Sequence, residues 1–409
     1  MKKILSFLLV LAMALSLVAC TSGAEQPNES KAPEAGNNET QPAVTNAEYK
    51  VAMVTDYGDI TDQSFNQTTW EAVVKFGADN GVEVKYYKPT SNDTAGRVAM
   101  VELAIAEGYN VIVLPGFAFG ATIYEVQDVY PDVKFIALDV SEFDVHDCFY
   151  NKDENGNWTT LIDENNPAHI AENVYCAIYQ EELCGYMAGY AAVKLGYTKL
   201  GFLGGMAVPA VMRYGYGFVQ GADAAAAELG ITVDMKYAYG NQFFGDADIT
   251  AVMDTWYAAG TEVVFACGGG IYTSAAEAAK KVDAKVIGVD VDQAAIIDGA
   301  YGEGMTVTSA MKGLAPATID TLVDVVINGN WAEYAGKIDT LGLISGDDAS
   351  LNYVGIPTAS TQFVDGKFTA EDYAALVKAM FEGTLVVSND IAAEPAVTNV
   401  NVEYLGNLK

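Results

Sequence analysis

The sequence predicts an α/β protein made of two doubly wound lobes, each built on a parallel sheet. Short runs rich in valine and isoleucine alternate with longer amphipathic stretches from residue 49 onward, as expected for buried parallel strands connected by helices. Glycine stands where several of these helices should end. The 409 residues are enough for two domains. A strand–helix alternation that occurs twice is typical of a doubly wound fold.

The strands and helices can be named individually from their apolar runs and glycine stops. The expected strands are Lys50–Thr55, Val82–Tyr87, Val111–Leu114, Val133–Leu138, Val174–Ile178, Leu200–Leu203, Val233–Tyr239, Val263–Ala266, Val286–Val289 and Thr306–Ser309. The expected helices are Ser64–Asp79, Ala95–Glu107, Glu181–Leu195, Pro209–Leu229, Ile249–Ala259, Ser274–Lys281 and Leu314–Ile327. Their order indicates one lobe before residue 141 and a second after residue 173.

The charge and composition exclude several classes of function. The formal net charge is −32, and such a chain repels the phosphate backbone, so we expect no nucleic-acid partner. The two histidines are His146 and His169, which leaves little material for histidine metal sites or histidine general bases. The Walker A, Gly-x-Gly-x-x-Gly and Gly-x-Ser-x-Gly motifs are all missing from the sequence. Nothing in the residues predicts an enzyme, a cofactor or a metal.

The N-terminus has the features of an export signal. Lys2 and Lys3 precede an apolar run that is too short for a comfortable membrane span and ends at Cys20. The ending Leu-Val-Ala-Cys resembles a bacterial lipobox, in which residues 1–19 are removed and Cys20 is lipidated. Residues 20–47 contain little to bury and should form a flexible tether. We therefore expect a protein anchored to the membrane by lipid, facing the extracytoplasmic side.

An acidic and amide-rich excursion, residues 141–173, separates the two halves. A calcium site there is conceivable, but the ligand spacing of a calcium loop is missing, so a solvated loop is the simpler interpretation. A disulfide between Cys148 and Cys176 is possible in an exported protein. Cys184 and Cys267 lie in apolar stretches and are expected to be small core residues.

Candidate binding residues follow the first predicted strand. Asp62 is placed to cap a helix that starts near Ser64. Phe65 and Asn66 then lie in its first turn, at the carboxyl edge of the sheet. A phenylalanine offers a stacking face, and an amide offers a donor and an acceptor. Core packing of Phe65 and helix-end bonding of Asn66 explain the pair equally well.

Polar residues also follow three other strands: Asp139, Asp290 and Lys312. Ligands of open α/β sheets bind at the carboxyl ends of the strands. A carboxylate there can accept bonds from hydroxyl or amide groups, and a lysine donates a charge-assisted bond. Each alone is explained by the solvated end of a strand, but together they predict one binding site.

Six motifs in order carry a specific resemblance. They are DQSFNQ (62–67), YQEELCGYMAG (179–189), GGMAVP (204–209), GFVQG (217–221), GVDVDQ (288–293) and TSAMK (308–312). The chain resembles the basic membrane protein (BMP) family of substrate-binding lipoproteins, and is similar to the purine nucleoside receptors of ABC importers. The resemblance covers roughly residues 50–327. It implies a type I periplasmic-binding-protein fold, with a nucleoside held in a hinge cleft between two lobes.

The resemblance also implies roles for the candidate residues. Phe65 would stack on one face of the base, with Asn66 bonding near it. Asp139 would read the edge of the base. Asp290 and Lys312 would hold the ribose hydroxyls, so replacing either by alanine should weaken binding while the fold is kept.

Two further positions come from the resemblance alone. Gly268 would bring its backbone close to the ligand. Tyr214 matches a second stacking position, where many relatives have phenylalanine. The resemblance places residues 48–165 and 291–325 in the N-terminal lobe, and residues 166–290 and 326–409 in the C-terminal lobe.

The sequence thus predicts a monomeric, lipid-anchored protein that captures a nucleoside, most plausibly a purine one, and delivers it to an ABC permease. We expect no catalysis and no cofactor. Three alternatives stay open: the same fold binding a sugar or a furanose-like signal molecule, a surface sensor with a signalling partner, and a hydrolase acting on nucleosides.

Overall fold

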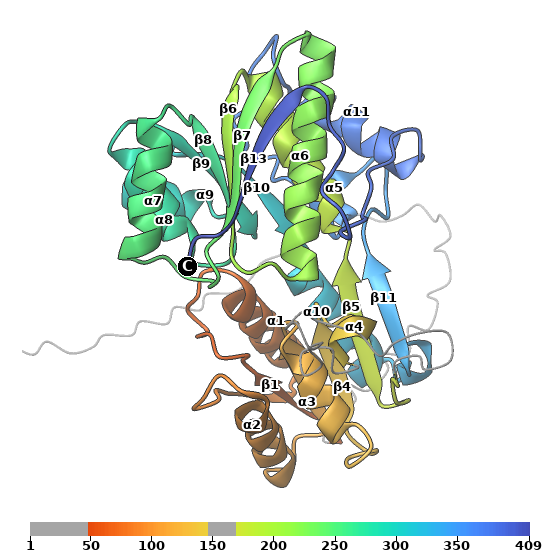
Figure 1. Cartoon of the computed structure of the whole chain (residues 1–409). Helices are drawn as coiled ribbons and strands as arrows, with labels where there is room; N and C mark the ends of the chain where they lie inside the picture. Colours follow the sequence, from red (N-terminus) through yellow and green to blue (C-terminus); the bar gives the residue numbers. More distant parts are fainter. Residues whose placement is uncertain (1–47, 146–168) are drawn as a thin grey trace, which may run out of the picture. The chain divides into compact units, whose positions relative to one another are not determined.

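The computed structural model describes residues 48–145 and 169–409, which form two mainly parallel sheets with helices between the strands (Figure 1). In spatial order, the first sheet contains β11 (Lys337–Leu341), β5 (Val174–Tyr179), β4 (Lys134–Leu138), β3 (Val111–Pro115), β1 (Lys50–Val54) and β2 (Glu83–Tyr87). The second contains β12 (Val354–Gly355), β10 (Thr306–Lys312), β9 (Lys285–Asp290), β8 (Val263–Cys267), β6 (Lys199–Gly204), β7 (Val233–Tyr239) and β13 (Val400–Asn407). The α/β class with two doubly wound sheets is confirmed.

The helices connect successive strands. They are α1 (Phe65–Asn80), α2 (Thr94–Ala106), α3 (Phe119–Val126), α4 (Glu142–Val145), α5 (Glu181–Leu195), α6 (Pro209–Leu229), α7 (Ala247–Ala258), α8 (Tyr272–Lys280), α9 (Ala294–Tyr301), α10 (Leu314–Leu322) and α11 (Ala370–Phe381). A π-helical turn, Val323–Ile327, continues α10, and short 3₁₀ turns occupy Trp331–Glu333 and Ala349–Leu351. All the strands and helices expected from the sequence are present at closely similar bounds. The elements α3, α4, α9, α11, β11, β12 and β13 were not predicted.

The predicted lobe boundaries are wrong where the chain crosses between the sheets. β5 pairs with β4 and β11 pairs with β5, so both strands belong to the first sheet. β10 pairs with β9 in the second sheet, whereas α10, which follows it directly, packs against α1 of the first lobe. The chain therefore crosses after β5, after β10 and between β11 and β12. Strand composition does not reveal these crossings, because it does not show which strands will pair.

Two of the glycine motifs are explained by the close packing of α5 against α6. A Cβ atom added at Gly185 would lie 2.2 Å from a backbone oxygen of α6, and one at Gly189 would lie 2.1 Å from another. Gly217 and Gly221 are equally close to α5, at 2.1 and 2.0 Å. Only glycine lets the two backbones approach this closely. This packing holds the start of α5 in place, directly after β5, where the chain first crosses from the first sheet to the second lobe.

Several expectations concern residues outside the described ranges. The signal peptide 1–19, Cys20, the tether 20–47 and most of the excursion, with His146 and Cys148, are among them. Cys176 is described and is a buried free thiol, and Cys184 and Cys267 are buried as expected. Within residues 48–145 and 169–409, no helix has both the length and the apolar character needed to span a membrane.

Candidate functional site

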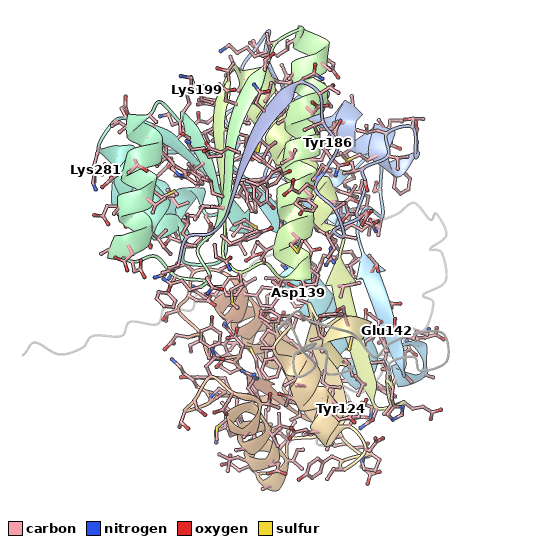
Figure 2. All side chains as sticks on the ribbon, in the orientation of Figure 1. Tyr124, Asp139, Glu142, Tyr186, Lys199 and Lys281 are labelled. Carbon is pink, nitrogen blue, oxygen red and sulfur yellow. The ribbon has the colours of Figure 1, made fainter. Side chains whose placement is uncertain are left out.

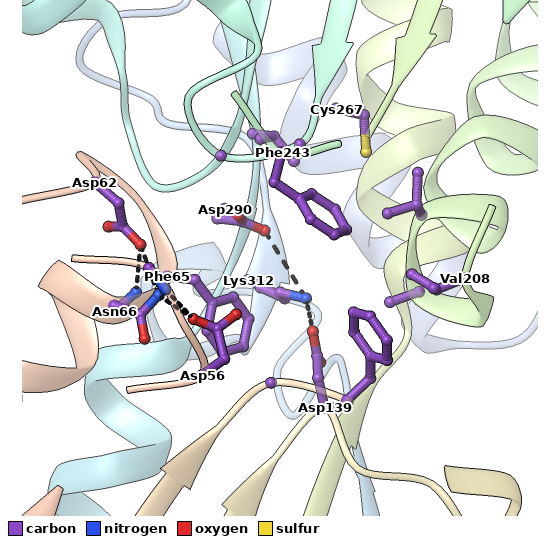
Figure 3. A pocket seen from close by; sticks show the side chains of 18 of the residues that line it. Asp56, Asp62, Phe65, Asn66, Asp139, Val208, Phe243, Cys267, Asp290 and Lys312 are labelled. Carbon is purple, nitrogen blue, oxygen red and sulfur yellow. Dashed lines mark hydrogen bonds and ion pairs between the residues drawn. The ribbon is translucent and has the colours of Figure 1, made fainter. Parts of the chain in front are cut away.

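A cavity of about 310 Å³ lies where the carboxyl ends of strands from both sheets meet, a size in the range of small-molecule sites. Figure 3 shows this cavity, and Figure 2 shows Asp139 near the junction of the two lobes. The eight residues expected to bind ligand all line it: Asp62, Phe65, Asn66, Asp139, Tyr214, Gly268, Asp290 and Lys312. The structure therefore brings together side chains that are up to 250 positions apart in the sequence, counted from Asp62 to Lys312 (312 − 62).

Lys312 lies at the centre of the polar groups. It is the last residue of β10 and is 5% exposed. Its ammonium group forms an ion pair with Asp139 from the first lobe, and its Nζ lies 3.8 Å from Asp290 and 3.5 Å from Glu181 (Figure 3). Burial by itself would lower the pKa of Lys312, but the three carboxylates raise it above the ordinary value. Lys312 is therefore a fixed cation that connects the two lobes.

Aromatic rings complete the surroundings of this cation. The Lys312 Nζ lies 4.9 Å from the ring centre of Phe65, 5.5 Å from that of Tyr179 and 5.6 Å from that of Tyr214. Tyr214 is 1% exposed and packs edge-on against Phe265 with ring centres 6.0 Å apart. Tyr214 thus lines the cavity with its ring held between Lys312 and Phe265, and its role in stacking on a ligand stays a prediction.

Asp139 and Asp290 occupy matching places in the two sheets, directly after β4 and at the end of β9. Both have left-handed backbone conformations, with φ of 58° and 65°, which aspartate tolerates better than most residues. Ser64 donates a 2.6 Å hydrogen bond to Asp290. Burial raises the pKa of Asp290, while Lys312 and Ser64 act in the opposite direction. The two strand ends thus turn their carboxylates toward the cavity.

The wall contributed by the start of α1 is polar, and it will be called the acidic wall: Asp56, Asp62 and Asn66. The N-cap residue of α1 is Ser64 and not Asp62, but the Asp62 carboxylate still bonds to the helix start, accepting the backbone N–H groups of Ser64 at 3.0 Å and Asn66 at 2.9 Å. The Asn66 side-chain Nδ2 donates to Asp56 at 3.1 Å and to Asp62 at 2.9 Å. Among the described residues, its Oδ1 is a buried acceptor without a partner. Burial raises the pKa of Asp56, which sequence reasoning did not single out.

The opposite wall is apolar, and it will be called the aromatic wall: Phe243, Phe244 and Gly268. The two phenylalanines lie in the segment between β7 and α7 and line the cavity. A Cβ atom at Gly205 would lie 2.4 Å from the Phe243 ring, and one at Gly268 would lie 2.8 Å from the Gly205 backbone. The glycines therefore make room for the Phe243 ring. Phe117 from the first lobe approaches it, with ring centres 6.3 Å apart.

The cavity carries an excess of negative charge. The carboxylates that line it are Asp56, Asp59, Asp62, Asp139, Asp144 and Asp290. The cations that line it are Lys312 and Arg213, and Arg213 already pairs with Glu181 at 2.7 Å. Such a lining favours hydroxyl and amide donors and repels anions. Within the described part of the chain, no group of acidic, histidine or cysteine side chains has the arrangement of a metal site.

Comparison with known proteins places the chain in a family. Residues 49–365 match the Bmp family, described as ABC transporter substrate-binding protein PnrA-like. The chain belongs to this family. The ABC transporter nucleoside-binding protein BmpA of Lactococcus lactis is 27% identical, over 78% of this chain and 88% of its own length. Basic membrane protein B of Borreliella burgdorferi is 25% identical, over 76% of this chain and 81% of its own.

A solved structure supports the fold. The ABC transporter solute-binding protein of Aeropyrum pernix superposes with a TM-score of 0.60 at 20% identity, covering 84% of this chain and 88% of its own. Membership of a substrate-binding family supports a role in binding rather than in catalysis. Relatives in Pyrococcus are named lipoproteins, in agreement with an extracytoplasmic protein held at a membrane. The expected resemblance to the BMP family is confirmed.

Proposed function

We propose that this substrate-binding protein captures a purine nucleoside in the cavity between its lobes and delivers it to an ABC permease. Lipidation of Cys20 would hold it at the membrane. The observation that supports this most directly is that an aromatic ring from each lobe, Phe65 and Phe243, lines the same cavity as buried carboxylates and a lysine. This combination matches a flat base joined to a sugar.

The base would occupy the space between Phe65 and Phe243. A stack of a base on an aromatic ring contributes about 1–3 kcal/mol, and rings from opposite lobes would both be engaged only when the lobes are together. Buried acceptors without partners in the described structure, Asn66 Oδ1 and Asp139 Oδ1, are suited to receive N–H donors of the base.

The ribose would lie against Asp290 and Lys312, which can accept from and donate to its hydroxyl groups. The excess of carboxylates in the cavity should affect the choice between a nucleoside and its phosphorylated form. A nucleoside is neutral, whereas its 5′-monophosphate is an anion that the same lining repels. The site should therefore select nucleosides over nucleotides.

Binding would act through hinge closure. The cavity takes residues from both lobes, and the chain crosses between the sheets next to Glu181 and Lys312. A ligand that contacts both lobes has its highest affinity for the closed form, and so shifts the population toward it. The permease would recognise that closed form.

Thermal unfolding tests the proposal. The full-length protein in mild detergent is stripped of bound ligand by unfolding and refolding, then heated with inosine, guanosine, adenosine, ribose or arabinose. At 100 times its dissociation constant, a ligand adds about 2.7 kcal/mol of stability. We expect a purine nucleoside to raise the melting temperature while ribose does not. A rise with a pentose alone would favour a sugar-binding protein, and release of free base from inosine would indicate a hydrolase.

A further inference from the structure

The C-terminal strand β13 adds an edge to the second sheet beyond the region that matches the family, which ends at residue 365. It runs parallel to β7, from Val400 opposite Val233 to Asn407 opposite Tyr239 (Figure 1). Tyr404 packs against Tyr237 with ring centres 5.1 Å apart. The strand therefore lies directly beside the element that leads into the aromatic wall.

The residues that follow β13 reach the segment carrying Phe243 and Phe244. The backbone N–H of Leu408 donates to the carbonyl oxygen of Tyr239 at 2.8 Å. The Lys409 ammonium group then forms an ion pair with Asp246, at the start of α7. The two contacts stand on either side of residues 240–245.

The side chain of Asp246 makes several of the contacts that hold this segment. Its carboxylate caps α7 by accepting the backbone N–H groups of Asp248 at 3.1 Å and Ile249 at 3.0 Å. Gln242 Nε2 donates to the same carboxylate at 3.0 Å and to the carbonyl oxygen of Phe244 at 2.8 Å. Lys409 thus joins a network that includes the backbone of the segment carrying the two phenylalanines.

The inner side of the segment is fixed separately. The carbonyl oxygen of Phe243 accepts a 3.0 Å bond from the backbone N–H of Gly270, and its ring lies on Gly205. The Phe243 ring is therefore held between the glycine loops on one side and the Asp246 network on the other. Removing either support should let the aromatic wall move.

We propose that Lys409 is a positioning residue for the cavity: through Asp246 it holds the segment 240–246 so that Phe243 faces the ligand space. The effect on ligand affinity rests on the proposed function, whereas the effect on the segment itself does not. A partly exposed ion pair contributes up to about 1 kcal/mol, which corresponds to about a 5-fold change in a local opening equilibrium.

Hydrogen–deuterium exchange on the full-length protein without ligand tests the proposal. Lys409→Ala should speed exchange in peptides covering residues 240–246 by about 2- to 5-fold, and Lys409→Arg should restore the original rate. The matched control is Lys236→Ala, which breaks an ion pair between β7 and β13 themselves, with Glu403 at 2.7 Å. The control should leave these peptides unchanged.

Exchange that is unaltered by Lys409→Ala, or accelerated equally by Lys236→Ala, would overturn the proposal. A second measurement separates it from the proposed function. If the wild-type protein binds a nucleoside, Lys409→Ala should weaken that binding by about the same 2- to 5-fold, while Lys236→Ala should not. If the wild-type protein binds no nucleoside, the proposed function fails, and the exchange rates still decide whether Lys409 positions the segment.

Discussion

The two walls of the cavity are built by opposite means. The acidic wall is fixed by hydrogen bonds within one stretch of chain, where Asp62 bonds to the start of α1 and Asn66 bridges two carboxylates. The aromatic wall is fixed by contacts between distant loops, where the Phe243 ring lies on Gly205 and Gly268 is packed against Gly205. The first wall offers charge and directional bonds, and the second offers a flat surface. A planar ring with N–H donors on its edge satisfies both.

The largest effect should come from the cation between the walls. Lys312→Ala leaves Asp139 and Asp290 buried without a cation, whereas Glu181 keeps its pair with Arg213. We therefore expect a loss of about 3 kcal/mol in the free energy of unfolding. The sequence alone suggested that the fold would tolerate this change; the 5% exposure of Lys312 argues against that. Denaturant unfolding measures the loss.

Lys378→Ala is the matched control for Lys312, because it breaks a surface pair with Asp347 at 3.0 Å. The control should lose no more than about 0.5 kcal/mol. Equal losses in the two variants would mean that the buried cation does not organise the cavity.

The aromatic wall should matter mainly for affinity. Phe243→Ala removes one stacking face, and we expect nucleoside binding to weaken by about 2 kcal/mol, or roughly 30-fold. Phe244→Ala should have a smaller effect because that side chain is 54% exposed. Calorimetric titration of both variants gives the comparison. If Phe244→Ala is the more damaging variant, the base does not lie against Phe243.

Asp144, another carboxylate that lines the cavity, should make the stability of the protein depend on pH. Burial raises the pKa of Asp144 from 3.8 to about 6. A carboxyl group whose pKa is raised in the folded protein stabilises the fold when the pH is below its pKa in the unfolded chain, which is 3.8 for Asp144. That stabilisation is lost as the pH rises through the folded-state pKa of about 6. Asp144→Asn cannot ionise, so it should gain about 1–2 kcal/mol relative to the wild type between pH 4 and 7.

Denaturant unfolding at several pH values checks the Asp144 prediction. Asp365→Asn, at an exposed position, should show no such pH-dependent difference. A constant difference between Asp144→Asn and the wild type across this range would show that Asp144 is not buried as a charged group.

The sequence predicted the polar part of the site because its signals are local. Asp139, Asp290 and Lys312 each follow a recognisable strand, and strand ends meet at one edge of a parallel sheet. Asp62 and Phe65 mark a helix start. Phe243 and Phe244 also follow a strand, β7, and that signal could have identified them.

The parts that the sequence did not predict depend on long-range contacts. The packing of the Tyr214 ring against Phe265 joins residues about 50 positions apart, and no local pattern shows it. Asp56 is held by the backbone N–H groups of Tyr57 and Gly58 and by the side chain of Asn66, and its burial, which the sequence does not show, makes it part of the site. The lobe boundaries and β13 depend on strand pairing between distant residues, which apolar runs do not encode.

The most direct test is a calorimetric titration of the stripped full-length protein with a nucleoside, its free base, ribose and its 5′-monophosphate. If the base lies between Phe65 and Phe243 while the ribose lies against Asp290 and Lys312, the nucleoside will bind more tightly than the base or ribose, and the monophosphate will bind more weakly than the nucleoside. Ribose binding as tightly as the nucleoside would contradict the role of the aromatic wall, and a preference for the monophosphate would contradict that of the acidic wall.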